Sequence, residues 1–203
     1  MDEAAFIARF QQTERGEQAA HPGPYVPRQT KAADWRDFAA VLNTVGGSLL
    51  SGDNGWRTAV QGVIDFDAGP VIAVAAAQPL LAGVTGWGPA GDPALPLSWE
   101  TVGLGILVAE LACAENAAVL LSSRSLPERG LAFLAQRLLV LVPRDRLVAD
   151  FITAQNQAAA LLQAHSDHHL TWMSGPSKTA DIEQCLVIGA HGARSLIVAA
   201  YDP

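Results

Sequence analysis

The chain is 203 residues long, with 50% hydrophobic and 16% charged residues and a net charge of −7. This length predicts one main domain that buries enough surface to fold without disulfides or structural metals. The negative charge argues against nucleic acid and against an anionic membrane surface as partners, because both bind basic surfaces.

The first 29 residues are predicted to form an N-terminal arm. Residues 3–18 allow a short helix with Phe6, Ile7 and Phe10 on one face, and residues 21–28 hold three prolines, which is typical of a linker. The apolar face of the arm must cover either its own domain or a partner chain, and the sequence does not choose between them. The main domain is then predicted to span residues 30–203.

The start of the chain and its most apolar stretch both indicate a cytoplasmic protein. The opening MDEAAFIARF has two acidic residues where a signal peptide needs basic ones. Residues 102–121 are interrupted by Glu110 and Glu115, which makes this stretch a poor membrane span.

The main domain is predicted to begin with two helices and two strands. Thr30 is placed to cap the first helix, and Gly46-Gly47 end it. The predicted elements are a helix with Trp35, Phe38, Leu42 and Val45 at helical spacing, a strand at 48–50, a helix with Trp56, Val60 and Val63, and a strand at 71–75. Residues 87–99 are rich in proline and glycine and are expected to form a surface loop.

The C-terminal part alternates strands and helices. It is predicted to hold strands at 137–142, 170–174 and 195–201, with a helix capped by Asp145 and another at 179–189 between them. Alternation with short connections predicts an α/β fold with a doubly wound, mostly parallel sheet and right-handed crossovers.

The run SGPSKTADIE, residues 174–183, is the first candidate for a ligand site. If it follows a parallel strand and opens a helix, it lies where open α/β sheets bind ligands and offers unpaired backbone N–H groups to an anion. The residues predicted to bind a small anionic ligand are Ser174, Gly175, Ser177, Lys178, Thr179 and Asp181. The alternative is that Ser177 or Thr179 merely caps the helix. Physical chemistry leaves both interpretations open.

Glu110 and Glu115 are the candidate catalytic residues, because an otherwise apolar run would bury them. Buried carboxylates need partners or have raised pKa values suited to acid–base chemistry. The alternative is that Glu110 ends a strand at the surface and Glu115 lies in a turn before the next strand.

Other motifs give no cofactor or metal site. Three prolines after residue 88 prevent the formal G-x-G-x-x-G match at residues 86–91 from opening a helix, and the histidines of residues 165–169 are more often solvated than metal-bound. Cys113 and Cys185 lie in apolar runs, and two cysteines are too few for an iron–sulfur cluster. We therefore expect no cofactor and no metal in this chain.

The closing segment resembles the LUD-domain, lactate-utilisation protein C family. SGPSKTADIE is followed at the family's spacing by LVIGAHG, with Ala193 where the family usually has proline. A weaker match covers residues 105–120, where the family has a T-G-A-D-x-A-I-A-E-T-G segment. Glu110 and Glu115 are retained there, whereas Asn116-Ala117 replace a small polar pair.

The resemblance implies a fold like that of sugar-phosphate isomerases and CoA transferases. It also implies a role in oxidising L-lactate to pyruvate beside two partner proteins, at least one of which carries iron–sulfur clusters. A homodimer is a further option. One alternative is an enzyme acting on a phosphorylated or CoA-linked substrate, with Glu115 as base or nucleophile. The other is a degenerate, non-catalytic paralogue.

Overall fold

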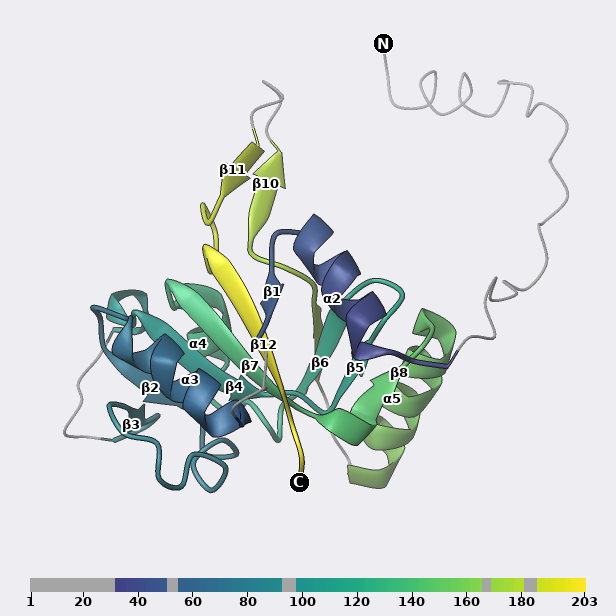
Figure 1. The fold of residues 1–203 in the computed structure, drawn as a ribbon, viewed down its shortest axis with the longest axis horizontal. Coiled ribbons are helices and arrows are strands. Elements are labelled where there is room, and N and C mark those ends of the chain that lie inside the picture. Colours follow the sequence, from purple (N-terminus) through teal and green to yellow (C-terminus); the bar gives the residue numbers. More distant parts are fainter. Residues whose placement is uncertain (1–31, 51–54, 93–97, 166–168, 181–185) are drawn as a thin grey trace, which may run out of the picture.

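The computed structural model describes residues 32–50, 55–92, 98–165, 169–180 and 186–203 (Figure 1). The arm predicted for residues 1–29 lies outside the described residues, as does Thr30. In the part of the chain that is described, no helix is long and apolar enough to cross a membrane.

A parallel sheet forms the centre of the molecule. Its strands, among the described residues, are β1 (Ser48–Leu49), β2 (Val71–Ala73), β3 (Gly88–Pro89), β4 (Leu104–Val108), β7 (Arg137–Pro143) and β12 (Ser195–Tyr201). They lie in the order β1-β12-β7-β4-β2-β3, and every neighbouring pair is parallel. The predicted mostly parallel α/β fold is therefore confirmed.

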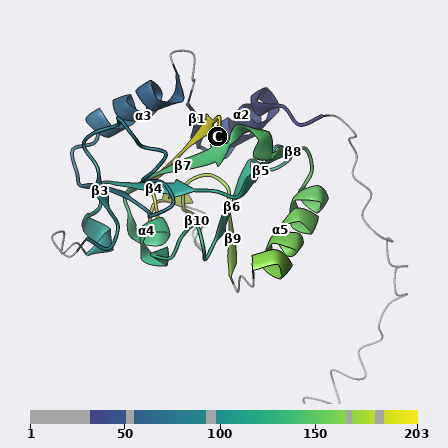
Figure 2. The same ribbon diagram turned by 90° about the horizontal axis from the view of Figure 1, so that it is seen from below.

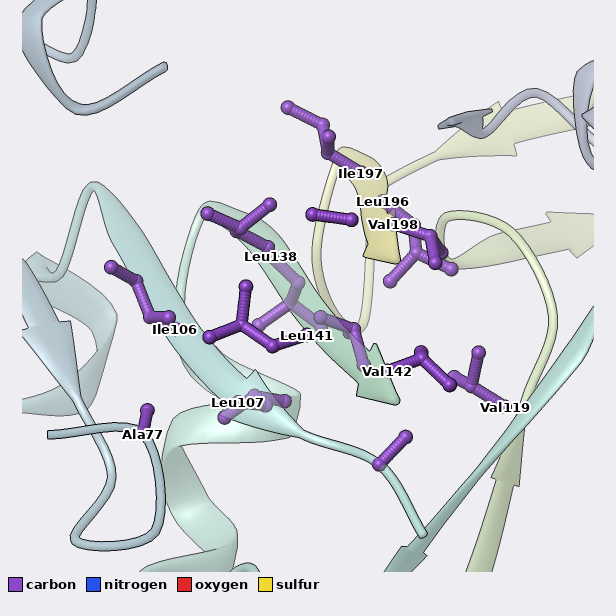
Figure 3. Close-up of a cluster of buried hydrophobic side chains, with 14 of the residues drawn as sticks. Ala77, Ile106, Leu107, Val119, Leu138, Leu141, Val142, Leu196, Ile197 and Val198 are labelled. Atoms are coloured by element: carbon purple, nitrogen blue, oxygen red, sulfur yellow. The ribbon is translucent and has the colours of Figure 1, made fainter. Parts of the chain in front are cut away.

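The three central strands of this sheet are apolar along most of their length because both of their faces are covered. Residues 138–142 of β7 and 196–201 of β12 are all buried, as are residues 104–107 of β4. Continuous apolar runs of this kind are typical of parallel strands between two layers. Figure 3 shows side chains of β4, β7 and β12 meeting in this core.

Helices cover the two faces of the sheet. Figure 2 shows α2 (Trp35–Thr44) and α3 (Trp56–Asp65) on one face and α4 (Arg129–Leu134) on the other. The first of these helices begins later than predicted. Asp34 caps α2, because its side chain accepts a hydrogen bond of 2.9 Å from the backbone N–H of Arg36.

A second sheet lies beside the first, in the order β8-β5-β6-β9. Its strands are β8 (Leu147–Val148), β5 (Leu111–Cys113), β6 (Ala118–Ser122) and β9 (Leu170–Met173). Helix α5 (Phe151–His165) packs against this sheet through a small core of Leu111, Cys113, Leu120, Ala154 and Ala158. The strand predicted at 170–174 is therefore present, but it pairs antiparallel with β6 and is no part of the parallel sheet.

One predicted helix of the C-terminal part begins later than expected, and another was wrong. Residues 144–146 form a 3₁₀ turn and Leu147 enters β8, so the helix begins at Phe151 and Asp145 does not cap it. In place of a helix at 179–189, β10 (Lys178–Ala180) pairs antiparallel with β11 (Leu186–Ile188), while residues 181–185 lie outside the described part. Short apolar runs fit either kind of element, so periodicity alone did not separate them.

Candidate functional site

The turn that follows β9 lies at the amino end of the parallel sheet. The N–H of Ser177 donates to the carbonyl of Ala193 at 2.9 Å, and the N–H of Gly189 donates to the carbonyl of Ser177 at 2.9 Å. Ala193 comes just before β12, so this turn is opposite the edge at which open α/β sheets bind ligands. The described residues after it form a strand, so the helix N-terminus that motivated an anion pocket is missing there.

Gly175 makes a close approach to the protein itself. Its φ is +71°, and a Cβ on this residue would lie 2.5 Å from the carbonyl oxygen of Val45, at the end of α2. Pro176, which is also buried, lies beside Gly46 in the same helix end. The glycine and proline of the motif therefore hold the chain against α2.

Lys178 lies over the same helix end. A Cβ placed on Gly46 would be 3.6 Å from Lys178 Nζ, and α2 has no basic residue in its own last turn. The last carbonyl groups of a helix carry partial negative charge, which an ammonium group stabilises. Lys178 is thus placed where its charge can favour the end of α2 without any ligand.

The structure brings the two motif-bearing turns together. The hydroxyl of Ser174 donates to the carbonyl of Asn116 at 2.7 Å. Beside it, Glu115 lies in the turn between β5 and β6, and its carboxylate accepts a 2.7 Å hydrogen bond from the N–H of Phe151, the first residue of α5. The turn alternative for Glu115 is confirmed, and its carboxylate occupies the start of a helix where an external anion would otherwise bind.

The residues around Glu115 are held by local geometry. Asn116 Oδ1 accepts from the N–H of Ala118 at 3.1 Å, and Ala117 between them is left-handed, with φ +51°. Burial is the main cause that raises the pKa of the Cys113 thiol, and the charges of Glu115 and Asp150 add to it. Cys113 is therefore a protonated, weakly nucleophilic core residue at neutral pH.

Glu110 stands at the opposite edge of the parallel sheet. It follows the carboxyl end of β4, and its backbone N–H donates to Leu120 of β6 at 2.8 Å. Its side chain is only 17% exposed, and its carboxylate accepts a 2.6 Å hydrogen bond from the hydroxyl of Ser122. Arg124, with a side chain that is 61% exposed, places one guanidinium nitrogen 3.8 Å from the other carboxylate oxygen.

Two buried serines order this group. Ser122 and Ser125 are 4% and 5% exposed, and their hydroxyls lie 3.2 Å apart. Each also bonds to the backbone N–H of the other, both at 3.1 Å. Neither of these serines nor Arg124 was among the residues predicted from the sequence, although the run SSRS directly after an apolar strand was the available signal.

Tyr201 completes the polar groups of the carboxyl edge. It ends β12, and its ring packs against Trp56 of α3 with 5.6 Å between ring centroids. Burial raises the pKa of the Tyr201 hydroxyl most, followed by the negative charges of Asp145 and Glu110. The carboxyl edge therefore holds Glu110 with Ser122 and Arg124 after the end of β4, and Tyr201 at the end of β12, two strands away.

The remaining sequence candidates form no site in the described part of the chain. His169 shares a 3.1 Å hydrogen bond with Thr171, and His165 ends α5. Over the residues described, no three histidine, cysteine or acidic side chains gather as a metal site. Asp181, His168 and Cys185 lie outside the described residues.

Comparison with known proteins gives a family match and a fold match. A model of the LUD domain matches residues 96–200, just over half of the chain. A crystal structure of a DUF162 family protein from Deinococcus radiodurans superposes with a TM-score of 0.59, covering 82% of this chain and 94% of that one. At 17% sequence identity, this likeness shows the fold alone.

The curated relatives are matched over a part of their length. Lactate utilization protein C of an Exiguobacterium strain is 33% identical over 91 residues, which are 44% of this chain and 40% of the relative. The protein of the same name from Geobacillus kaustophilus is 31% identical over 99 residues, covering 46% of this chain and 40% of the relative. The chain therefore spans about two fifths of the length of these relatives.

Proposed function

The chain belongs to the LUD domain family, and on that premise we propose that it serves in lactate utilisation as a subunit that binds a small carboxylate ligand. The relatives named lactate utilization protein C support this proposal. We place its work in the cytoplasm, together with partner subunits that carry iron–sulfur clusters. The two cysteines of this chain are too few to hold such a cluster, so electrons from lactate would have to reach a partner.

The observation that carries the proposal is the carboxylate of Glu110 at the carboxyl end of β4. This is the edge at which open α/β sheets bind ligands. The carboxylate is mostly buried, and Ser122 holds it at 2.6 Å. A carboxyl group with so little exposure needs partners inside the protein, and Ser122 and Arg124 supply them.

The chemistry of this edge suits a 2-hydroxy acid or the corresponding 2-oxo acid. The exposed guanidinium of Arg124 presents donors that match the two oxygens of a carboxylate. The carboxylate of Glu110 can accept a hydrogen bond from the ligand hydroxyl, and the phenol of Tyr201 can donate one to a ligand oxygen. We therefore propose that Arg124 holds the ligand carboxylate while Glu110 faces the hydroxyl group.

The turn of residues 174–179, together with Asp181, remains a predicted second anion site. The support for this second site is now weaker, because the N–H of Ser177 already donates to Ala193 and Lys178 lies beside the end of α2. The support for Glu115 as a base or nucleophile is also weaker, since its carboxylate accepts a hydrogen bond from the first residue of α5. The carboxyl edge is therefore our first choice.

Isothermal titration of the full chain with L-lactate, pyruvate, inorganic phosphate and coenzyme A tests the proposal. We expect lactate or pyruvate to bind, and Arg124→Ala to weaken that binding by at least about tenfold, which corresponds to about 1.4 kcal/mol. Arg144→Ala is the matched control, because Arg144 follows β7 at the same edge and pairs with Asp202 instead.

Three results would count against the proposal. Absence of binding by both lactate and pyruvate removes it. Equal weakening by Arg124→Ala and Arg144→Ala shows a diffuse charge effect rather than a site. Binding of phosphate or coenzyme A that depends on Lys178 and not on Arg124 moves the site to the turn after β9.

A further inference from the structure

Strand β11 carries three consecutive apolar side chains that the described structure leaves exposed. Leu186, Val187 and Ile188 are 61%, 46% and 52% exposed. Successive side chains of a strand point to opposite faces, so both faces of the hairpin β10–β11 present apolar groups. Figure 1 shows this hairpin extending beyond the end of the main sheet.

The apolar surface continues at the base of the hairpin. Phe133 and Leu134, at the end of α4, are 43% and 47% exposed. They are near the segment that links β11 to β12, because a Cβ on Gly192 would lie 3.6 Å from the carbonyl oxygen of Phe133. The end of α4 therefore adds two exposed apolar side chains near the segment that connects β11 to β12.

The outer edge of β11 is open to strand pairing. In the described structure β11 has β10 as its ladder partner, and the residues Leu-Val-Ile include no proline or charge that would blunt an edge. A two-stranded hairpin with exposed faces is at best marginally stable on its own. An added strand would satisfy the backbone groups of the edge and widen the sheet.

We propose that this edge binds a second copy of the chain, with the two β11 strands antiparallel across a two-fold axis. The strand is self-complementary in this arrangement, and the pairing closes after two copies. Val187 is the middle residue, so it faces Val187 of the partner subunit. The pairing satisfies the free backbone groups of both edges, and each apolar side chain of one β11 gains an apolar cross-strand neighbour from the other.

The test uses sedimentation of the full chain over a range of concentrations up to about 100 μM, far above a micromolar dissociation constant. We expect the wild type to dimerise, and Val187→Glu and Val187→Lys each to raise the dimer dissociation constant by at least about tenfold, because each brings two like charges together. Since residue 187 faces its own copy, an equimolar mixture of the two variants should restore the dimer. Phe66→Glu is the control, because Phe66 is 82% exposed and lies at the end of α3.

Several outcomes overturn the inference. One is a wild type that stays monomeric at every concentration, and another is a Val187→Glu variant that dimerises as the wild type does. Equal loss of the dimer in Phe66→Glu would show general charge repulsion. If each Val187 variant is monomeric and the mixture stays so, β11 does not pair with itself, and the surface belongs to another protein. Matching circular dichroism spectra and thermal midpoints establish that the variants are folded.

Discussion

Replacing Gly175 with alanine tests whether the glycine of the SGPSKT motif serves the fold. The substitution has two costs. At φ +71° a Cβ is disfavoured by about 1 kcal/mol, and a Cβ at 2.5 Å from the carbonyl oxygen of Val45 must displace backbone at the end of α2. Displacements of this kind in a packed region cost about 1–3 kcal/mol. We therefore expect a total loss of about 3 kcal/mol, which lowers the thermal midpoint of a chain of this size by about 6–12 °C.

Gly83→Ala is the matched control for this experiment. Gly83 has φ +83°, but nothing lies within 4 Å of a Cβ placed on it. This variant reports the backbone cost alone, about 1 kcal/mol or 2–4 °C. The difference between the two variants, measured by thermal and urea unfolding, is then the cost of the contact with α2.

The result that refutes this reasoning is a Gly175→Ala variant as stable as Gly83→Ala. The close approach to Val45 would then be dispensable, and the glycine would have to serve something other than the fold. A variant that keeps its ligand-free midpoint but loses a ligand-induced rise in midpoint would point to binding at the turn after β9.

The remaining predictions concern charged groups. Lys178→Ala is expected to cost about 0.3–1 kcal/mol in unfolding experiments at low salt and less at high salt, because the ammonium faces the end of α2; an unchanged midpoint at low salt would contradict this. Asp67→Ala is expected to lower the free energy of unfolding by about 2–4 kcal/mol, because the largely buried carboxylate accepts a hydrogen bond of 2.9 Å from Arg137. A loss under about 1 kcal/mol would show that water replaces the ion pair. Hydrogen bonds from the N–H and hydroxyl of Thr153 lower the pKa of Asp150. The ionised carboxylate therefore stabilises the fold fully above its unfolded pKa of about 3.9, and this stabilisation is lost as the pH falls through the lower folded pKa. Asp150→Ala should therefore lower stability at neutral pH and narrow its difference from wild type in acid, as denaturant titrations at several pH values would show.

The sequence by itself determined the central layer of the protein. The runs that form β4, β7 and β12 are apolar along their central residues, and burial between two layers of helices is the fold that such runs favour. It also offered a turn as one of two interpretations of Glu115, and the structure places Glu115 in the turn between β5 and β6. These properties are local, because they depend on side-chain type and short-range geometry.

The tertiary structure alone decided how the flanking segments pair. Strand β9 reads the same in sequence whether it joins the parallel sheet or pairs antiparallel with β6, since that choice depends on contacts far away in the chain. The segment after Ser177 has apolar residues at spacings that fit a helix, yet β10 and β11 form a hairpin there. Propensity is weak compared with the pairing of backbone groups, so the partner decides the element.

The candidate site was likewise predicted in part from the sequence and completed by the tertiary structure. The sequence singled out Glu110, but the partners that hold it, Ser122 and Arg124, become its neighbours only when β6 folds back beside the end of β4. Likewise, the bond between Ser174 and Asn116 joins segments 58 residues apart. A sequence fixes which groups are available for chemistry, whereas the fold decides which of them meet, because burial and hydrogen bonding act between neighbours in space.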